Sequence, residues 1–145
     1  MATTRNARAH WEGTLLEGQG TVEMTSSGIG TYPITWASRA ESADGRTSPE
    51  ELIAAAHASC YSMALGATLG GEGFTPEKIE THAAVTLAKV EGGFAVTKIA
   101  LTTTASVPGA TKEAFDKAAA DAKAGCPISK LFANNTEITL DAKLV

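Results

Sequence analysis

The stretch from residue 51 to residue 72 constrains the fold of this chain more than any other part of the sequence. No charged residue occurs between Glu51 and Glu72, and alanine, glycine and apolar side chains fill most of the positions. A helix that is small or apolar on every side is typical of a buried position. One domain of 145 residues rarely surrounds such a helix, so we expect two copies to pack their long helices together as a homodimer. The alternative is a monomer whose own sheet and second helix cover the long helix.

Both ends of this helix are marked in the sequence. Ser48 can act as the N-cap, Pro49 suits the first helical position, and Glu51 can complete a capping box with Ser48. The Gly70-Gly71 pair predicts the end. The helix should therefore contain about 22 residues and extend roughly 33 Å.

Alternating and amphipathic patterns on either side of the long helix predict the other elements. Before it we expect a hairpin and a third strand, and after it a long hairpin with a turn at Gly92-Gly93, an amphipathic helix, a short helix and a final strand. The predicted strands span 9–17, 20–25, 33–38, 79–90, 94–107 and 136–144, the amphipathic helix spans 111–123, and the short helix opens at 126–130. The order β-β-β-α-β-β-α-β indicates the α+β class, as a single domain over residues 1–145.

Composition excludes several classes of function. The chain is 43% hydrophobic and 19% charged, which is typical of a globular protein. Its formal charge is −4 and it has no basic run, so nucleic acid and anionic membrane surfaces are not expected partners. We expect no transmembrane helix, and the N-terminal residues lack the apolar core of a signal peptide. These features predict a cytoplasmic protein.

The chain has only two cysteines, Cys60 and Cys126. In the cytoplasm, cysteines are more often catalytic, redox-active or metal-binding than paired in structural disulfides. Cys60 lies about ten residues into the long helix, beyond the reach of the helix dipole, and apolar surroundings raise a thiol pKa. A reactive Cys60 therefore needs a cation from elsewhere, and His57, Arg39 and Arg46 are the candidates. The alternative is that Cys60 is a small core residue.

Cys126 has a different setting, between a glycine and a proline at the start of a short helix. The N-terminus of a helix stabilises a thiolate, although an inert buried thiol is also possible. Together, His57, Cys60, His82 and Cys126 would form a four-ligand zinc set, but their spacing matches no compact zinc motif. We expect His57 to be a core histidine that is hydrogen-bonded to the backbone, and the alternative is a polar group near the pocket.

Three segments closely resemble the OsmC branch of the OsmC/Ohr family of thiol-dependent hydroperoxide reductases. They read SPEELIAAAHASCYSMAL, AGCPISKLF and AHWEG, and a fourth segment, GFAVTKIAL, is similar to a strand of the same family. The resemblance extends from about residue 9 to residue 145. Two separate cysteine motifs in the same order make it specific.

This resemblance implies an intertwined homodimer with two long central helices and active sites at the subunit interface. Family members reduce organic hydroperoxides, and hydrogen peroxide less readily, with an external dithiol as reductant and no metal, flavin or haem cofactor. The position of the reactive cysteine matches Cys60, and that of the second cysteine, which forms a disulfide with it, matches Cys126. The catalytic arginine and glutamate match Arg39 and Glu50.

In this scheme the Arg39 guanidinium keeps Cys60 anionic and Glu50 holds Arg39 in place. Cys60 would attack the peroxide and become a sulfenic acid, which Cys126 would convert to a disulfide. Apolar walls would favour greasy hydroperoxides, while departures from the family at 26–32 and 132–136 would alter substrate preference. Arg46 is the alternative activating cation. The alternative functions are a non-enzymatic module that binds a hydrophobic ligand or metal, and a peroxide sensor.

Overall fold

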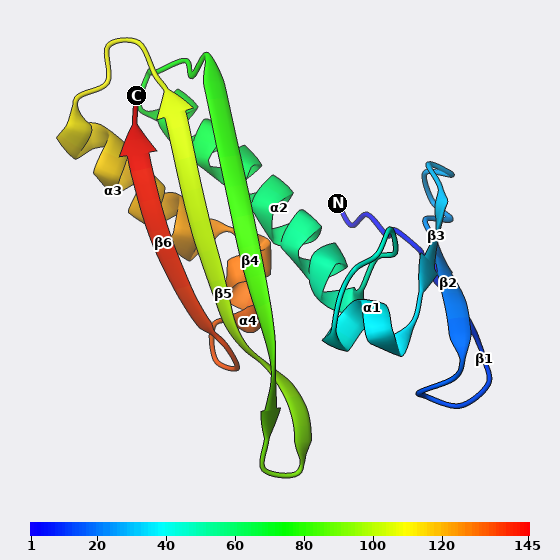
Figure 1. Ribbon diagram of the computed structural model, residues 1–145. Coiled ribbons are helices and arrows are strands. Elements are labelled where there is room, and N and C mark those ends of the chain that lie inside the picture. Colours follow the sequence, from blue (N-terminus) through cyan, green and yellow to red (C-terminus); the bar gives the residue numbers. More distant parts are fainter. The chain divides into compact units, whose positions relative to one another are not determined.

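The computed structural model describes all residues from 1 to 145 and divides the chain into two compact units, Met1–Leu52 and Ile53–Val145. The first unit contains strands β1 (Arg8–Glu12), β2 (Gln19–Glu23) and β3 (Thr31–Ile34), helix α1 (Trp36–Ala40) and the first turn of α2 (Pro49–Gly71). The second unit contains the rest of α2, strands β4 (Lys78–Val90), β5 (Gly93–Ser106) and β6 (Glu137–Leu144), and helices α3 (Lys112–Gly125) and α4 (Pro127–Phe132) (Figure 1).

The first unit is built on an antiparallel sheet with strand order β1-β2-β3. The predicted first hairpin is confirmed, although its strands are shorter and its loop longer than expected. The third predicted strand, 33–38, is wrong in its second half, because the chain leaves β3 at Ile34 and turns into α1. Thr35 and Ser38 form a reciprocal capping box there, and those hydrogen bonds favour a helix over continued extension.

The start of α2 agrees with the prediction in most respects. Ser48 Oγ accepts a hydrogen bond from the Glu51 backbone N–H at 3.1 Å, as an N-cap should. The expected capping box is only half formed, because the Glu51 carboxylate accepts from the Thr47 hydroxyl at 2.6 Å. The helix ends at Gly71, within the predicted glycine pair.

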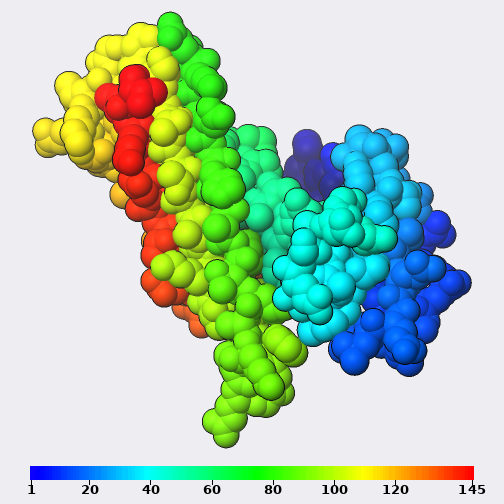
Figure 2. Space-filling view, viewed as in Figure 1, coloured from blue at the N-terminus to red at the C-terminus, as the bar shows by residue number.

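The second unit is a three-stranded sheet of order β4-β5-β6, with α2, α3 and α4 on one face (Figure 1). The predicted long hairpin and last strand are confirmed: β4 and β5 are antiparallel, and β6 returns parallel to β5 after α3 and α4. The strands form adjacent bands across the outer face of this unit (Figure 2). Alternate residues of β5 face the helices and are buried, namely Ile99, Leu101, Thr103 and Ala105.

Burial of α2 within the single chain differs from the sequence-based expectation. One stripe with a spacing of four residues is fully buried, and it consists of His57, Tyr61, Leu65 and Leu69. A second stripe is exposed, and it consists of Ala55, Ser59, Met63 and Ala67. The prediction of burial on every side is therefore wrong for one isolated chain.

Helix α2 has a second property that the sequence analysis did not anticipate. By length and composition alone, it meets the requirement for a membrane-spanning helix. It is nevertheless interrupted by polar side chains, and two of them, on His57 and Tyr61, are fully buried against the other elements of the second unit.

Candidate active site

The two cysteines, 66 positions apart in sequence, come together in the second unit. Their sulfur atoms lie 3.2 Å apart, within hydrogen-bond distance for sulfur, and both thiols are free. Cys60 is on α2 and partly buried, whereas Cys126 is fully buried between α3 and α4. A disulfide needs a sulfur–sulfur distance of about 2 Å, so a small movement would join them.

Cys126 is held at a junction between two helices. It is the C-cap of α3 and the N-cap of α4, and its backbone N–H donates to the Ala122 carbonyl at 2.8 Å. Pro127 occupies the first position of α4, where a missing N–H costs nothing. The N–H groups of Ile128 and Ser129 are consequently free to face the Cys126 sulfur.

The surroundings favour a thiolate on Cys126 rather than on Cys60. Burial alone would raise the pKa of Cys126, but hydrogen bonding from the Ser129 N–H and hydroxyl, from Cys60 and from the Ile128 N–H lowers it overall. The Cys126 side chain makes no capping hydrogen bond as a neutral thiol. The N–H groups of Ile128 and Ser129 therefore stabilise chiefly the thiolate of Cys126. Burial raises the pKa of Cys60, and the Ile128 N–H offsets only part of this effect.

A buried histidine is linked to this thiol pair. His57 Nε2 lies 2.7 Å from Ser129 Oγ, while His57 Nδ1 is buried without a partner. The structure thus brings His57 to a side chain, not to the backbone partner that one reading of the sequence suggested. Burial lowers the pKa of His57, so the ring is neutral at physiological pH. The Phe132 ring packs against it at 6.4 Å between centroids.

Tyr61, one residue after Cys60, completes the buried wall beside the thiols. Its hydroxyl donates to the Ala119 carbonyl at 3.2 Å. Burial, and after it the nearby Cys126, raises the pKa of Tyr61 to about 12. A phenol with this pKa stays neutral at physiological pH.

Arg39 and Glu50 lie in the first unit. Arg39 Nε is 3.0 Å from Glu50 Oε1 and 3.2 Å from Oε2, and Arg39 Nη2 is 2.9 Å from Oε1. The Glu50 side chain is 9% exposed and that of Arg39 is 35% exposed, so the carboxylate is buried behind the guanidinium. Arg46, the alternative cation, contacts Asp44 through its backbone carbonyl and its carboxylate.

A pocket of about 310 Å³ in the first unit has Arg39 in its wall. Its other lining residues are mostly apolar and come from β1, the following loop and the segment around α1; they are Trp11, Leu15, Ile34, Thr35, Trp36 and Pro49. The Arg39 guanidinium carbon lies 5.9 Å from the centre of the Trp36 ring, within the range of a cation–π contact. This pocket combines the permanently charged Arg39 guanidinium with mostly apolar walls.

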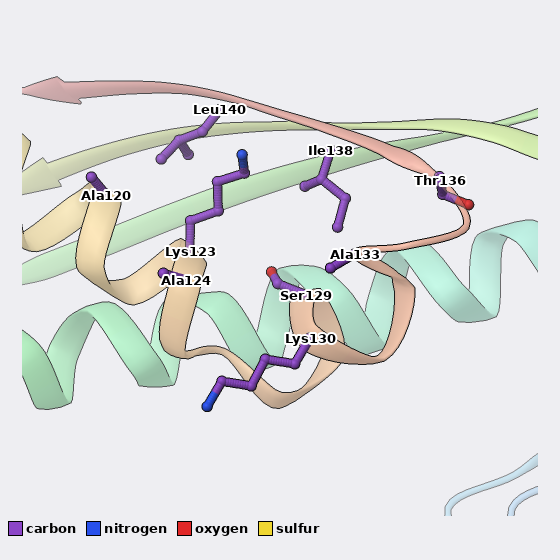
Figure 3. Close-up of a pocket in the computed structure, with 9 residues that line it drawn as sticks. All are labelled: Ala120, Lys123, Ala124, Ser129, Lys130, Ala133, Thr136, Ile138 and Leu140. Carbon is purple, nitrogen blue, oxygen red and sulfur yellow. The ribbon is translucent and has the colours of Figure 1, made fainter.

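A second pocket, of about 530 Å³, lies in the second unit between α3, α4 and β6. Figure 3 shows Lys123 reaching from α3 toward β6, and Ser129 on α4 lining the same space. Lys130 is the other charged residue among its lining residues.

The proposed zinc set does not assemble. No group of three or more histidine, cysteine, aspartate or glutamate side chains in residues 1–145 is arranged to hold a metal ion. His82 is on the exposed face of β4, whereas His57 is buried on α2. Sequence reasoning also missed Ser129, whose only signal was its place in the first turn of a short helix after Cys126.

Comparison with known proteins identifies the family of this chain. A family model described as OsmC-like protein matches residues 42–141. The chain is 48% identical over 144 residues to Peroxiredoxin OsmC of Escherichia coli (strain K12), with 99% of each chain covered. The same values hold for Peroxiredoxin OsmC of Shigella flexneri.

Solved structures show the same fold. The organic hydroperoxide resistance protein OsmC of Legionella pneumophila is 26% identical with a TM-score of 0.75, covering 100% of this chain and 99% of that one. OhrB of Bacillus subtilis, an organic hydroperoxide resistance protein, is 25% identical with a TM-score of 0.72, covering 95% and 98% of the two chains. These matches confirm the predicted α+β fold with its long central helix, and the chain belongs to the OsmC-like family.

Proposed function

We propose that this protein reduces organic hydroperoxides to alcohols, and hydrogen peroxide more slowly, with Cys60 and Cys126 as its redox-active pair. The observation that carries the proposal is the 3.2 Å separation of the two sulfur atoms, which suits a thiol pair that cycles through a disulfide. Full-length similarity to proteins named peroxiredoxin supports the same chemistry, since a peroxiredoxin is a thiol peroxidase.

In the first step the Cys60 thiolate attacks the terminal peroxide oxygen. The O–O bond breaks, the alcohol leaves after taking up a proton, and Cys60 becomes a sulfenic acid. Cys126 then attacks the Cys60 sulfur, the S–O bond breaks, and water leaves as the disulfide forms. An external dithiol reduces the disulfide and restores both thiols.

Arg39 is the proposed activating cation and Glu50 its anchor. Burial raises the pKa of Cys60, so attack near neutral pH needs a source of positive charge beyond the Ile128 N–H. The paired hydrogen bonds between Arg39 and Glu50 support a guanidinium held in one orientation, which Arg46 lacks. A fixed guanidinium would also stabilise negative charge that develops on the peroxide oxygens.

The proposed substrates are hydroperoxides with apolar groups, such as those of fatty acids or alkyl aromatics. Support comes from the pocket beside Arg39, whose walls include two tryptophans and a leucine. Burying a greasy group against these side chains removes apolar surface from water and favours binding. The exposed Leu16, next to this pocket in sequence, could extend the same apolar surface.

The proposed assembly is a homodimer of one OsmC-like domain per chain. The exposed stripe of Ala55, Ser59, Met63 and Ala67 supports it, because small side chains let a second helix approach closely and Met63 is 69% exposed in the single chain. We propose a cytoplasmic location, where dithiol reductants are available.

Consumption of tert-butyl hydroperoxide with dithiothreitol as reductant tests the function. Wild-type protein should turn over, Cys60→Ser should not, and the exposed-strand variant Thr102→Ser should match the wild type. Lack of turnover by the wild type, with no disulfide formed after hydroperoxide treatment, would reject the peroxidase.

A further inference from the structure

The mechanism above gives no role to His57 and Ser129, although they form a buried polar pair beside the thiols. His57 is fully buried and Ser129 is 4% exposed. A polar pair that is removed from water is costly unless it is satisfied, and here His57 Nδ1 remains without any partner. Such an arrangement calls for a reason other than packing.

The two residues form a hydrogen-bonded pair whose serine acts on Cys126. Ser129 Oγ lies 2.7 Å from His57 Nε2, and the Ser129 hydroxyl and N–H both act on the Cys126 sulfur. A neutral His57 with its proton on Nε2 donates to Ser129 Oγ, which leaves the serine proton free to point at sulfur. In this tautomer Nδ1 is an unprotonated acceptor, and it is the atom that remains buried without a partner.

We propose that His57 and Ser129 are positioning residues that hold Cys126 as a thiolate ready to close the disulfide. The inference rests on the proposed function, because it assigns them to its second step. The Cys126 thiolate attacks the sulfur of the Cys60 sulfenic acid, the S–S bond forms, and the S–O bond breaks. The hydroxide that leaves takes a proton from solvent and becomes water.

The other groups beside His57 and Ser129 do not replace the effect of this pair on Cys126. Tyr61 donates to the Ala119 carbonyl and stays neutral, and Cys60 is the partner thiol itself. The charged side chains of the pocket that Ser129 lines are Lys123 and Lys130, and neither is among the groups that shift the pKa of Cys126. The strand residues of that pocket are Thr136, Ile138 and Leu140, and none of them titrates.

The first test is a pH titration of Cys126 by ultraviolet thiolate absorbance in a Cys60→Ser background, where Cys126 is the only thiol. Ser129→Ala should raise the midpoint by about one unit, which means about tenfold less thiolate below it. His57→Leu should raise it by less, and His57→Gln, which keeps a donor, should return it toward the parent value. Ser106→Ala is the control, since its hydroxyl donates to Glu77 elsewhere in the unit.

An unchanged midpoint in a folded Ser129→Ala variant would overturn the proposal. Should that variant unfold, the double variant His57→Leu/Ser129→Ala carries the test, because it removes both partners and leaves no buried polar group unpaired. The double variant should show the same raised midpoint, and a parent-like value would again overturn the proposal.

The second test follows a single turnover of otherwise native protein after one equivalent of tert-butyl hydroperoxide. Dimedone adducts and intact mass separate the sulfenic acid from the disulfide. Ser129→Ala should form the sulfenic acid no more slowly than wild type but close the disulfide about tenfold more slowly at neutral pH, and recover as the pH rises. Equal closure rates at every pH would overturn the inference. Absence of both products in the wild type would instead overturn the proposed function, and the thiol titration would still decide this inference.

Discussion

Arg39 and Glu50 are joined by three nitrogen–oxygen contacts of 2.9 to 3.2 Å, with the carboxylate buried and the guanidinium partly open to solvent. Such a paired geometry restrains the guanidinium far more than a single contact would. Glu50 is in the first turn of α2, where the helix dipole also favours its negative charge. The pair therefore fixes a permanent cation at the wall of an apolar pocket.

The first prediction concerns this cation. Arg39→Ala should slow sulfenic acid formation on Cys60 about tenfold or more at neutral pH, because removal of an activating cation raises a thiol pKa by one or more units. Stopped-flow mixing with excess hydroperoxide measures the rate. Arg46→Ala is the matched control and should keep the wild-type rate. Equal rates in the two variants would remove Arg39 from the mechanism.

The second prediction concerns the anchor. Glu50→Gln keeps the size of the side chain but loses the charge that orients Arg39, so hydroperoxide reduction should fall severalfold. The free energy of unfolding should fall by only about 1 kcal/mol, because the Arg39 side of the ion pair is partly exposed and solvent screens the interaction. A double-mutant cycle with Arg39→Ala, read from urea unfolding and from activity, measures the coupling. Strictly additive effects of the two substitutions would contradict a coupling between Arg39 and Glu50.

The third prediction concerns the thiols. Cys126→Ser should leave the Cys60 sulfenic acid trapped and reactive to dimedone, whereas wild type should lose two hydrogens as the disulfide closes. Intact mass spectrometry after one equivalent of hydroperoxide distinguishes the two products. An intramolecular disulfide cannot form in the variant, so unchanged turnover would show that an external thiol resolves the sulfenic acid.

The fourth prediction concerns alkaline pH. The pKa of Tyr61 is about 12 in the folded protein, above its ordinary value near 10. The unfolded chain therefore ionises first, and the contribution of Tyr61 is complete below about pH 10 and lost as the pH rises toward 12. The loss should be about 2 to 3 kcal/mol. Tyr61→Phe should be less stable at neutral pH but lack this part of the alkaline decline in urea unfolding. Wild-type and Tyr61→Phe stabilities that decline in parallel between about pH 10 and 12 would contradict the raised pKa of Tyr61.

The fifth prediction concerns assembly. Met63→Glu places a charge on the exposed stripe of α2 and should convert the proposed homodimer to monomer, because burying an unpaired carboxylate is costly. Light scattering after size-exclusion chromatography gives the mass. Thr102→Glu, on the exposed face of β5, is the control and should remain dimeric. A dimeric Met63→Glu variant would place the interface elsewhere.

Local sequence determined most of the secondary structure. Ser48 and Pro49 define the start of α2, and alternation of side chains defines β4, β5 and β6, because these signals act between residues close in the chain. After Ile34 the strand pattern gives a wrong prediction, because the capping box of Thr35 and Ser38 favours a helix there. The sequence also singled out both cysteines, while the roles of Arg39 and Glu50 came from the family resemblance, and these site roles stay predictions.

Tertiary structure decided the chemistry of the thiol site. The separation of Cys60 from Cys126, the contact of His57 with Ser129, and the direction of each thiol pKa depend on how α2, α3 and α4 pack on the sheet. No local pattern specifies these distances, since they join residues 66 and 72 positions apart. Electrostatic effects vary with distance and burial, so the sequence by itself determined which groups are present, and packing determined which of them interact.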